Sequence, residues 1–270
     1  GKVATIVPIS LFIDGCRIRL HHLIYVKTLY LIKIVHTVEL PPNLTTLIID
    51  RNMCEDSLYY GCLKSLKVIK LVNTCINEVK LNGSDLTNLE VLEFNTHNER
   101  VDLKQFASIK KLSVNYLGSN YCLNTWLNSL HSATLQDMHL ILRNLTELEI
   151  HNSPYISDIK NLSYIRNIKL IECKIITLIE DIHNMESLTL KGCSIREINN
   201  ISNINTLRLI ECGQLISITN IKTVDNIRIS NCRLFREIGN WRMIGMVELR
   251  GCPKLIDKTE LKNAIEVKIN

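Results

Sequence analysis

The sequence predicts an α/β-type repeat solenoid, in which short parallel strands stack into a sheet and the chain returns between them. Three observations carry this prediction. Cysteine recurs every 19 or 20 residues, at Cys173, Cys193, Cys212, Cys232 and Cys252. An alternating pair of aliphatic residues precedes each of these cysteines. The chain is 46% hydrophobic but only 5% aromatic, which is typical of thin layers filled by Leu, Ile and Val.

The alternating aliphatic pair indicates a strand with one buried face, because successive side chains of a strand point to opposite sides. The same frame extends along the 270-residue chain and gives thirteen candidate strands. Their pairs are Leu11/Ile13, Leu29/Leu31, Leu47/Ile49, Ile69/Leu71, Leu92/Phe94, Leu112/Val114, Leu148/Ile150, Ile168/Leu170, Leu188/Leu190, Leu207/Leu209, Ile227/Ile229, Val247/Leu249 and Val267/Ile269. We therefore expect a single domain, residues 1–270, of about 13 turns.

The returns between the strands are short, since a turn of about 20 residues leaves too little chain for a full helix. We expect them to be mostly non-helical, extended or 3₁₀. The exception is an insertion around residues 115–147, where the rhythm breaks. There Leu123, Trp126, Leu127 and Leu130 follow helical spacing, which predicts a partly helical segment. This segment either packs on the solenoid or protrudes and offers Trp126 to a partner.

The repeat frame resembles the leucine-rich repeat family, whose core motif is LxxLxLxxN/CxL. The family's Asn/Cys position is occupied by Cys16, Asn52 and the five periodic cysteines, whereas Ile34, Thr74, His97 and Ser153 depart from it. The short period is similar to internalins and to the leucine-rich repeat regulatory subunit of protein phosphatase 1. The resemblance implies a horseshoe or arc with a concave parallel sheet, and partners usually bind that concave side.

The cysteines have a structural interpretation and a functional alternative. A buried cysteine is a small hydrophobe that fits the inward slot where the backbone turns. Stacked thiols that bind a metal or sense redox state are the alternative. The chain contains no CxxC pair, so a zinc ribbon or a thioredoxin-like motif has no support.

Catalytic signatures are missing from the sequence, which contains no GxGxxG, GxxxxGK[ST], HExxH or GxSxG motif. We expect no enzyme activity, no cofactor, no metal and no small-molecule substrate. The net charge of +5 is spread over both halves, which argues against nucleic acid as the partner. No apolar run reaches 18 residues, so we expect no transmembrane segment.

The expected partner is another protein, bound through the concave face by two sets of side chains. The first set is apolar: Phe12, Tyr30 and Ile48, together with Ile32 and Val72. The second is a basic stripe: Lys169, Lys191, Arg208, Arg228 and Arg250, together with Lys268. Aromatic residues and arginine are enriched at interface hot spots. The alternatives are an ordinary solvated surface, an apolar patch covered by residues outside this sequence, and weak polyanion binding by the stripe.

The expected role is intracellular scaffolding or regulation in the cytoplasm. The alternative is an extracellular or cell-surface adhesion domain, as in internalins. Asn-x-Ser/Thr sequons begin at Asn43, Asn82, Asn144, Asn161 and Asn200. Asparagine is so frequent that such sequons arise by chance and do not establish secretion.

Overall fold

The computed structural model describes residues 10–14, 20, 22–33, 38–51, 57–60, 63–75, 79–80, 86–96, 108–116, 144–153, 158–160, 165–255 and 259–269. The chain divides into two compact units, which separate the strands up to residue 116 from those that begin at residue 147. In both units parallel strands stack as a β-solenoid. Helix within the described residues is confined to two 3₁₀ segments, η1 (Leu63–Ser65) and η5 (Thr259–Asn263).

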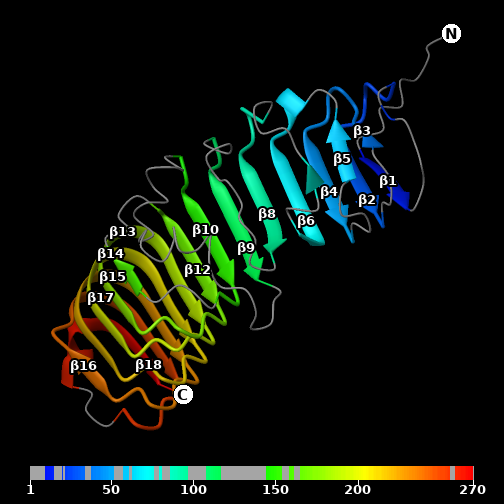
Figure 1. The fold of residues 1–270 in the computed structure, drawn as a ribbon. Coiled ribbons are helices and arrows are strands. Elements are labelled where there is room, and N and C mark those ends of the chain that lie inside the picture. Colours follow the sequence, from blue (N-terminus) through cyan, green and yellow to red (C-terminus); the bar gives the residue numbers. More distant parts are fainter. Residues whose placement is uncertain are drawn as a thin grey trace. The chain divides into compact units, whose positions relative to one another are not determined.

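The first unit contains a main sheet and a smaller second sheet (Figure 1). The main sheet has the order β1 (Ser10–Asp14), β2 (Thr28–Ile32), β4 (Thr46–Asp50), β6 (Val68–Cys75), β8 (Val91–Thr96), β9 (Lys111–Tyr116). The returns between its strands supply the second sheet, in the order β3 (Val38–Glu39), β5 (Ser57–Tyr60), β7 (Val79–Lys80). The returns of this unit are therefore partly extended, as expected for a short repeat.

The second unit continues the same design with longer strands (Figure 1). Its main-sheet order is β10 (Glu147–His151), β12 (Asn167–Ile171), β13 (Leu178–Lys191), β14 (Glu197–Ile210), β15 (Ser217–Ser230), β17 (Arg242–Arg250), β18 (Ala264–Ile269). Two short strands flank the starts of the long ones, β11 (Asp158–Lys160) on β13 and β16 (Glu237–Gly239) on β15. Here the extended return and the main-sheet strand form one continuous element.

The predicted strands are confirmed, since each of the thirteen apolar pairs lies in a main-sheet strand and the pairings within each unit are parallel. The register matches one repeat to the next, as where Leu188 pairs with Leu207 and Leu207 with Ile227. These inward residues are buried except at the two terminal strands: Leu11 on β1 is half-buried, and Val267 and Ile269 on β18 are 38% and 49% exposed. The parallel solenoid is thus established. The arc shape and the single-domain organisation stay predictions.

The turns from β12 to β17 bend at three corners where the backbone adopts positive φ. The first corner ladder is Asp181, Asn200, Asn220 and Asn240; the second is Asn184, Asn203, Thr223 and Met243; the third, which starts after β10, is Asn152, Glu172, Gly192, Glu211, Asn231 and Gly251. Positive φ disfavours most side chains, and Asn, Asp and Gly tolerate it best. The abundant asparagine of the sequence is therefore partly a set of solenoid corners.

The cysteine ladder follows directly after the third corner. Each of the five thiols donates to the carbonyl two residues earlier, at 3.5 or 3.6 Å, and to a carbonyl of the preceding turn. Thr74 occupies the same slot in the first unit, is 1% exposed and donates to the Val72 carbonyl at 3.0 Å. Ser153 is buried at the equivalent position. Two of the four departures from the motif, Thr74 and Ser153, are therefore small polar residues that fit the same slot, and the other two, Ile34 and His97, lie outside the described residues.

The insertion around residues 115–147 is described only at its ends, by β9 up to Tyr116 and by Asn144 onward. The expected helix, with Leu123, Trp126, Leu127 and Leu130, lies outside the described residues.

Candidate interaction surface

The outward face of the main sheet in the second unit is organised as two parallel ladders of side chains. The first ladder runs through Lys169, Thr189, Arg208, Arg228, Glu248 and Lys268, each the register partner of the next. The second lies two residues further along each strand and runs through Ile171, Lys191, Ile210, Ser230 and Arg250. Successive rungs are about 4.8 Å apart. The register therefore assembles the predicted basic stripe on one face.

The charges of this face are only partly compensated. Lys169 donates to Glu149 on the preceding rung at 2.6 Å, and Arg228 lies 3.3 Å from Glu248 on the following rung. Within the described part of the chain, Lys191, Arg208 and Arg250 form no ion pair. All three are exposed. We refer to Lys191, Arg208, Arg228 and Arg250 as the basic cluster.

A polar group on β10 and β12 borders the same face. His151 Nε2 and Lys169 Nζ both contact Oε1 of Glu149, at 2.8 and 2.6 Å. Burial favours the protonated form of Glu149, but the hydrogen bonds from Lys169 and His151 outweigh it and lower the pKa of the carboxyl. The carboxylate is thus held ionised as a fixed acceptor, so it neutralises Lys169.

The outward face of the first unit is apolar at its first strands. Phe12 on β1 and Tyr30 on β2 stack with ring centroids 4.1 Å apart and planes 9° from parallel. Phe12 remains 65% exposed, and Val72 on β6 is also exposed. Ile48 on β4 is the register partner of Tyr30 and continues the row. An exposed aromatic stack with aliphatic neighbours is the kind of patch that marks contact sites.

The predicted site residues are therefore brought together in two sets, each within its own unit. Phe12, Tyr30 and Ile48 are adjacent on β1, β2 and β4. The second set comprises Lys169, Lys191, Arg208, Arg228 and Arg250. The structure refines this set, because carboxylates on adjacent rungs compensate Lys169 and Arg228.

Two features were not predicted from the sequence. His183 Nδ1 lies 2.7 Å from Ser202 Oγ across β13 and β14, in the manner of a base and a nucleophile. Catalysis of that kind needs a third group that orients the histidine. Among the described residues no carboxylate bonds to His183, and the pair does not line the cavity described below. We therefore assign it no chemistry.

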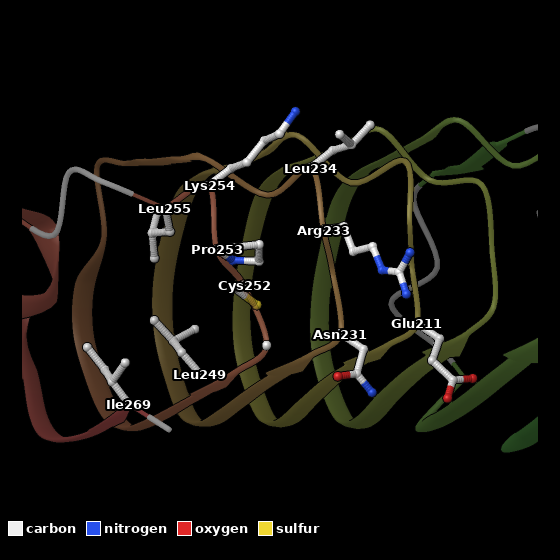
Figure 2. A pocket seen from close by; sticks show the side chains of 11 residues that line it. Glu211, Asn231, Arg233, Leu234, Leu249, Cys252, Pro253, Lys254, Leu255 and Ile269 are labelled. Carbon is white, nitrogen blue, oxygen red and sulfur yellow. The ribbon is translucent and has the colours of Figure 1, made fainter.

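The second feature is a cavity of about 1120 Å³ beside β17 and β18. Figure 2 shows Leu249, Leu255 and Ile269 on one side of it and Arg233 and Glu211 on the other. Ile269 lines it from the strand whose inward residues remain exposed. The repeat pattern of the sequence could not reveal this cavity. In that pattern Val267 and Ile269 are equivalent to the buried pairs of the other strands, so they were expected to be buried as well.

The five cysteines of the ladder are free thiols, four of them buried and Cys252 half-buried. The neighbouring Cys193 thiol and burial raise the pKa of Cys173, and Cys232 and burial do the same for Cys212. Burial raises the pKa of Cys252. The same hydrogen bonding lowers the pKa of the partners, Cys193 beside Cys173 and Cys232 beside Cys212, but these two thiols are themselves buried. Because four of the five thiols are buried, the ladder acts as a packing element in this structure.

The chain matches no protein-family model, and no curated protein is significantly similar to it. Across the described ranges, no helix has the length and apolar character needed to traverse a lipid bilayer. The described residues also contain no candidate metal site, since no three His, Cys, Asp or Glu side chains among them converge.

Proposed function

We propose that this protein is an interaction module that binds another protein through the outward faces of its main sheets. The observation that carries the proposal is the basic cluster, in which Lys191, Arg208 and Arg250 stand exposed on three strands without an ion pair among the described residues. Charged and aromatic side chains carried by a sheet are suited to recognition, because the backbone that positions them is already ordered before binding.

The apolar row of the first unit supports the same role. The Phe12–Tyr30 stack presents a large apolar area in a fixed orientation. Aromatic anchors of this kind contribute disproportionately to the free energy of protein association. The two sets of residues therefore offer an apolar anchor and a charged contact, each on its own unit.

Membership of the leucine-rich repeat family is part of the proposal. It is supported by the repeat frame, the parallel register and the small-residue slot that Cys, Thr74 and Ser153 share. In that family the sheet face is the usual binding surface. No individual contact residue is carried over, because the shared motif is structural.

We place the protein in a reducing compartment such as the cytoplasm. Adjacent rungs bring Cys173, Cys193, Cys212 and Cys232 within the Cα separation that a disulfide spans, yet all are free. The amide nitrogens of two sequon residues are also engaged: Asn200 Nδ2 donates to Asp181 and Asn43 Nδ2 to the Ile24 carbonyl. Glycosylation at either nitrogen would disrupt these hydrogen bonds.

Affinity capture from the source organism with matched variants tests the proposal. Arg208→Glu with Arg228→Glu reverses two charges on the outward face of β14 and β15. Lys222→Glu with Arg242→Glu makes the same charge change on β15 and β17 away from that face. We expect the first pair to abolish capture of a specific protein partner and the second to leave it unchanged. Equal capture by both folded variants would refute the proposal.

A further inference from the structure

We infer that the partner contributes an extended segment rich in Asp or Glu alternating with aliphatic residues, which lies across β13, β14, β15 and β17 on the basic cluster. The inference rests on the proposed function, since it names the kind of protein segment that this face binds.

The spacing within two pairs of cations, Lys191 with Arg208 and Arg228 with Arg250, matches the dimensions of an extended chain. Lys191 pairs with Ile210 whereas Arg208 pairs with Thr189, so Lys191 and Arg208 are diagonal neighbours. Arg228 and Arg250 are diagonal neighbours in the same way, across β15 and β17. Diagonal positions are about 7–8 Å apart, close to the roughly 6.8 Å between residues i and i+2 of an extended chain. The cluster spans three rung steps, about 14 Å, which four or five extended residues cover.

The charges of the cluster require anions from outside the described chain. Arg208 and Arg228 are direct register partners, and like charges placed side by side repel each other. Glu248 reaches Arg228 but leaves Arg208 uncompensated. The guanidinium group presents a planar fork of donors that fits a carboxylate with two hydrogen bonds. A bound carboxylate would therefore relieve the repulsion between the two arginines.

The surroundings of the cluster favour a protein segment over a nucleic acid. Ile171 and Ile210 flank Lys191 in the second ladder and are partly exposed, so they offer apolar contact between the cations. From β12 to β18 the described outward ladders contain no aromatic side chain on which a base could stack, and the nearest aromatic ring, His151 on β10, is engaged with Glu149. Ile171 and Ile210, on either side of Lys191, would contact aliphatic side chains that lie between the acidic residues of the bound segment.

Fluorescence anisotropy with the full chain tests the inference. The probe is a labelled nine-residue peptide of alternating Glu and Val, and its control has Gln in place of Glu. A single-stranded RNA oligonucleotide of similar length is the third probe. We expect the Glu peptide to bind at least about tenfold more tightly than the Gln peptide. Arg208→Glu with Arg250→Glu should weaken that binding by at least about tenfold, and Lys222→Glu with Arg242→Glu should not change it.

Three outcomes would overturn the inference: equal binding of the Glu and Gln peptides, insensitivity to the Arg208 and Arg250 changes, or tighter binding of RNA than of the acidic peptide. Circular dichroism establishes that each variant is folded, and Arg208→Gln replaces the reversal if it is not. If the acidic peptide fails while partner capture still depends on Arg208 and Arg228, the proposed function stands and this inference falls.

Discussion

Trp241 donates its indole Nε1–H to the carbonyl oxygen of Ile218, 2.9 Å away in the buried interior. The indole fills the position that Ile221 holds one turn earlier, directly before the register partners Lys222 and Arg242. Around it, Glu260 accepts from the Trp241 amide and Asn263 donates to the Trp241 carbonyl at 2.7 Å. This residue therefore connects the solenoid core to η5.

Replacing Trp241 with Phe should lower the free energy of unfolding by about 2–4 kcal/mol. The change leaves the buried Ile218 carbonyl without its donor and removes part of the ring volume. Urea titration followed by far-UV circular dichroism measures the effect. Arg242→Ala, at an exposed neighbouring position, is the control and should change stability by less than about 0.5 kcal/mol. Equal behaviour of the two variants would contradict this account.

Replacing Thr223 with Asn should raise the free energy of unfolding by about 1 kcal/mol. Thr223 is β-branched and has a φ of 53°, a conformation that is strained for such a residue. Preceding turns use Asn184 and Asn203 at this corner, where Asn203 Nδ2 donates to Asn184 Oδ1 at 3.0 Å. Thermal unfolding of the variant measures the gain. The reverse change, Asn203→Thr, should lose a similar amount, and a gain from both would refute the corner explanation.

Replacing Gly245 with Ala should destabilise the protein by at least about 2 kcal/mol. An added Cβ would lie 2.3 Å from the backbone oxygen of Asp225, which belongs to the adjacent strand and cannot move without disturbing the ladder. Gly213→Ala is the matched control, because no atom lies within 4 Å of its added Cβ. That variant should be neutral or stabilised by up to about 1 kcal/mol. Chemical denaturation of the two variants side by side gives the comparison.

Thiol labelling should modify Cys252 before the four buried cysteines of the ladder. Cys252 is half-buried and lines the cavity, whereas modification of the others requires the chain to open. Mass spectrometry of partly labelled protein identifies the modified sites. Faster labelling of Cys212 than of Cys252 in native protein would contradict the described burial.

The raised pKa of Cys252 also predicts a pH dependence. Above the unfolded thiol pKa of about 8.5, the unfolded state loses this proton while the folded state keeps it. The free energy of unfolding should therefore fall as pH rises beyond about 8.5, and Cys252→Ser should reduce that slope. Urea titrations at a series of alkaline pH values measure it, and identical slopes would sink the prediction.

The strands could be predicted from the sequence because each turn repeats the same pattern of inward apolar residues. Leu188, Leu207 and Ile227 occupy equivalent inward positions, so a period-two pattern recurring every 19 or 20 residues was sufficient to locate their strands. The corners were not predicted, because Glu172 and Glu211 are not residues that ordinarily indicate positive φ. The sequence also did not show that Cys193, Thr74 and Ser153 occupy equivalent buried positions, because the three residue types differ.

The sequence by itself determined the parallel strands, the inward aliphatic pairs and the side of the sheet on which Arg208 and Phe12 stand. Side-chain alternation along a strand is a local property, so it does not depend on how the strand pairs with adjacent strands. The tertiary structure decided which charges are compensated. Glu149 lies twenty positions from Lys169, and Glu248 twenty from Arg228, so each ion pair depends on the register between turns. That register follows from the length and corners of each return, and it placed Arg208 beside Arg228 with no carboxylate of its own among the residues that the structure describes.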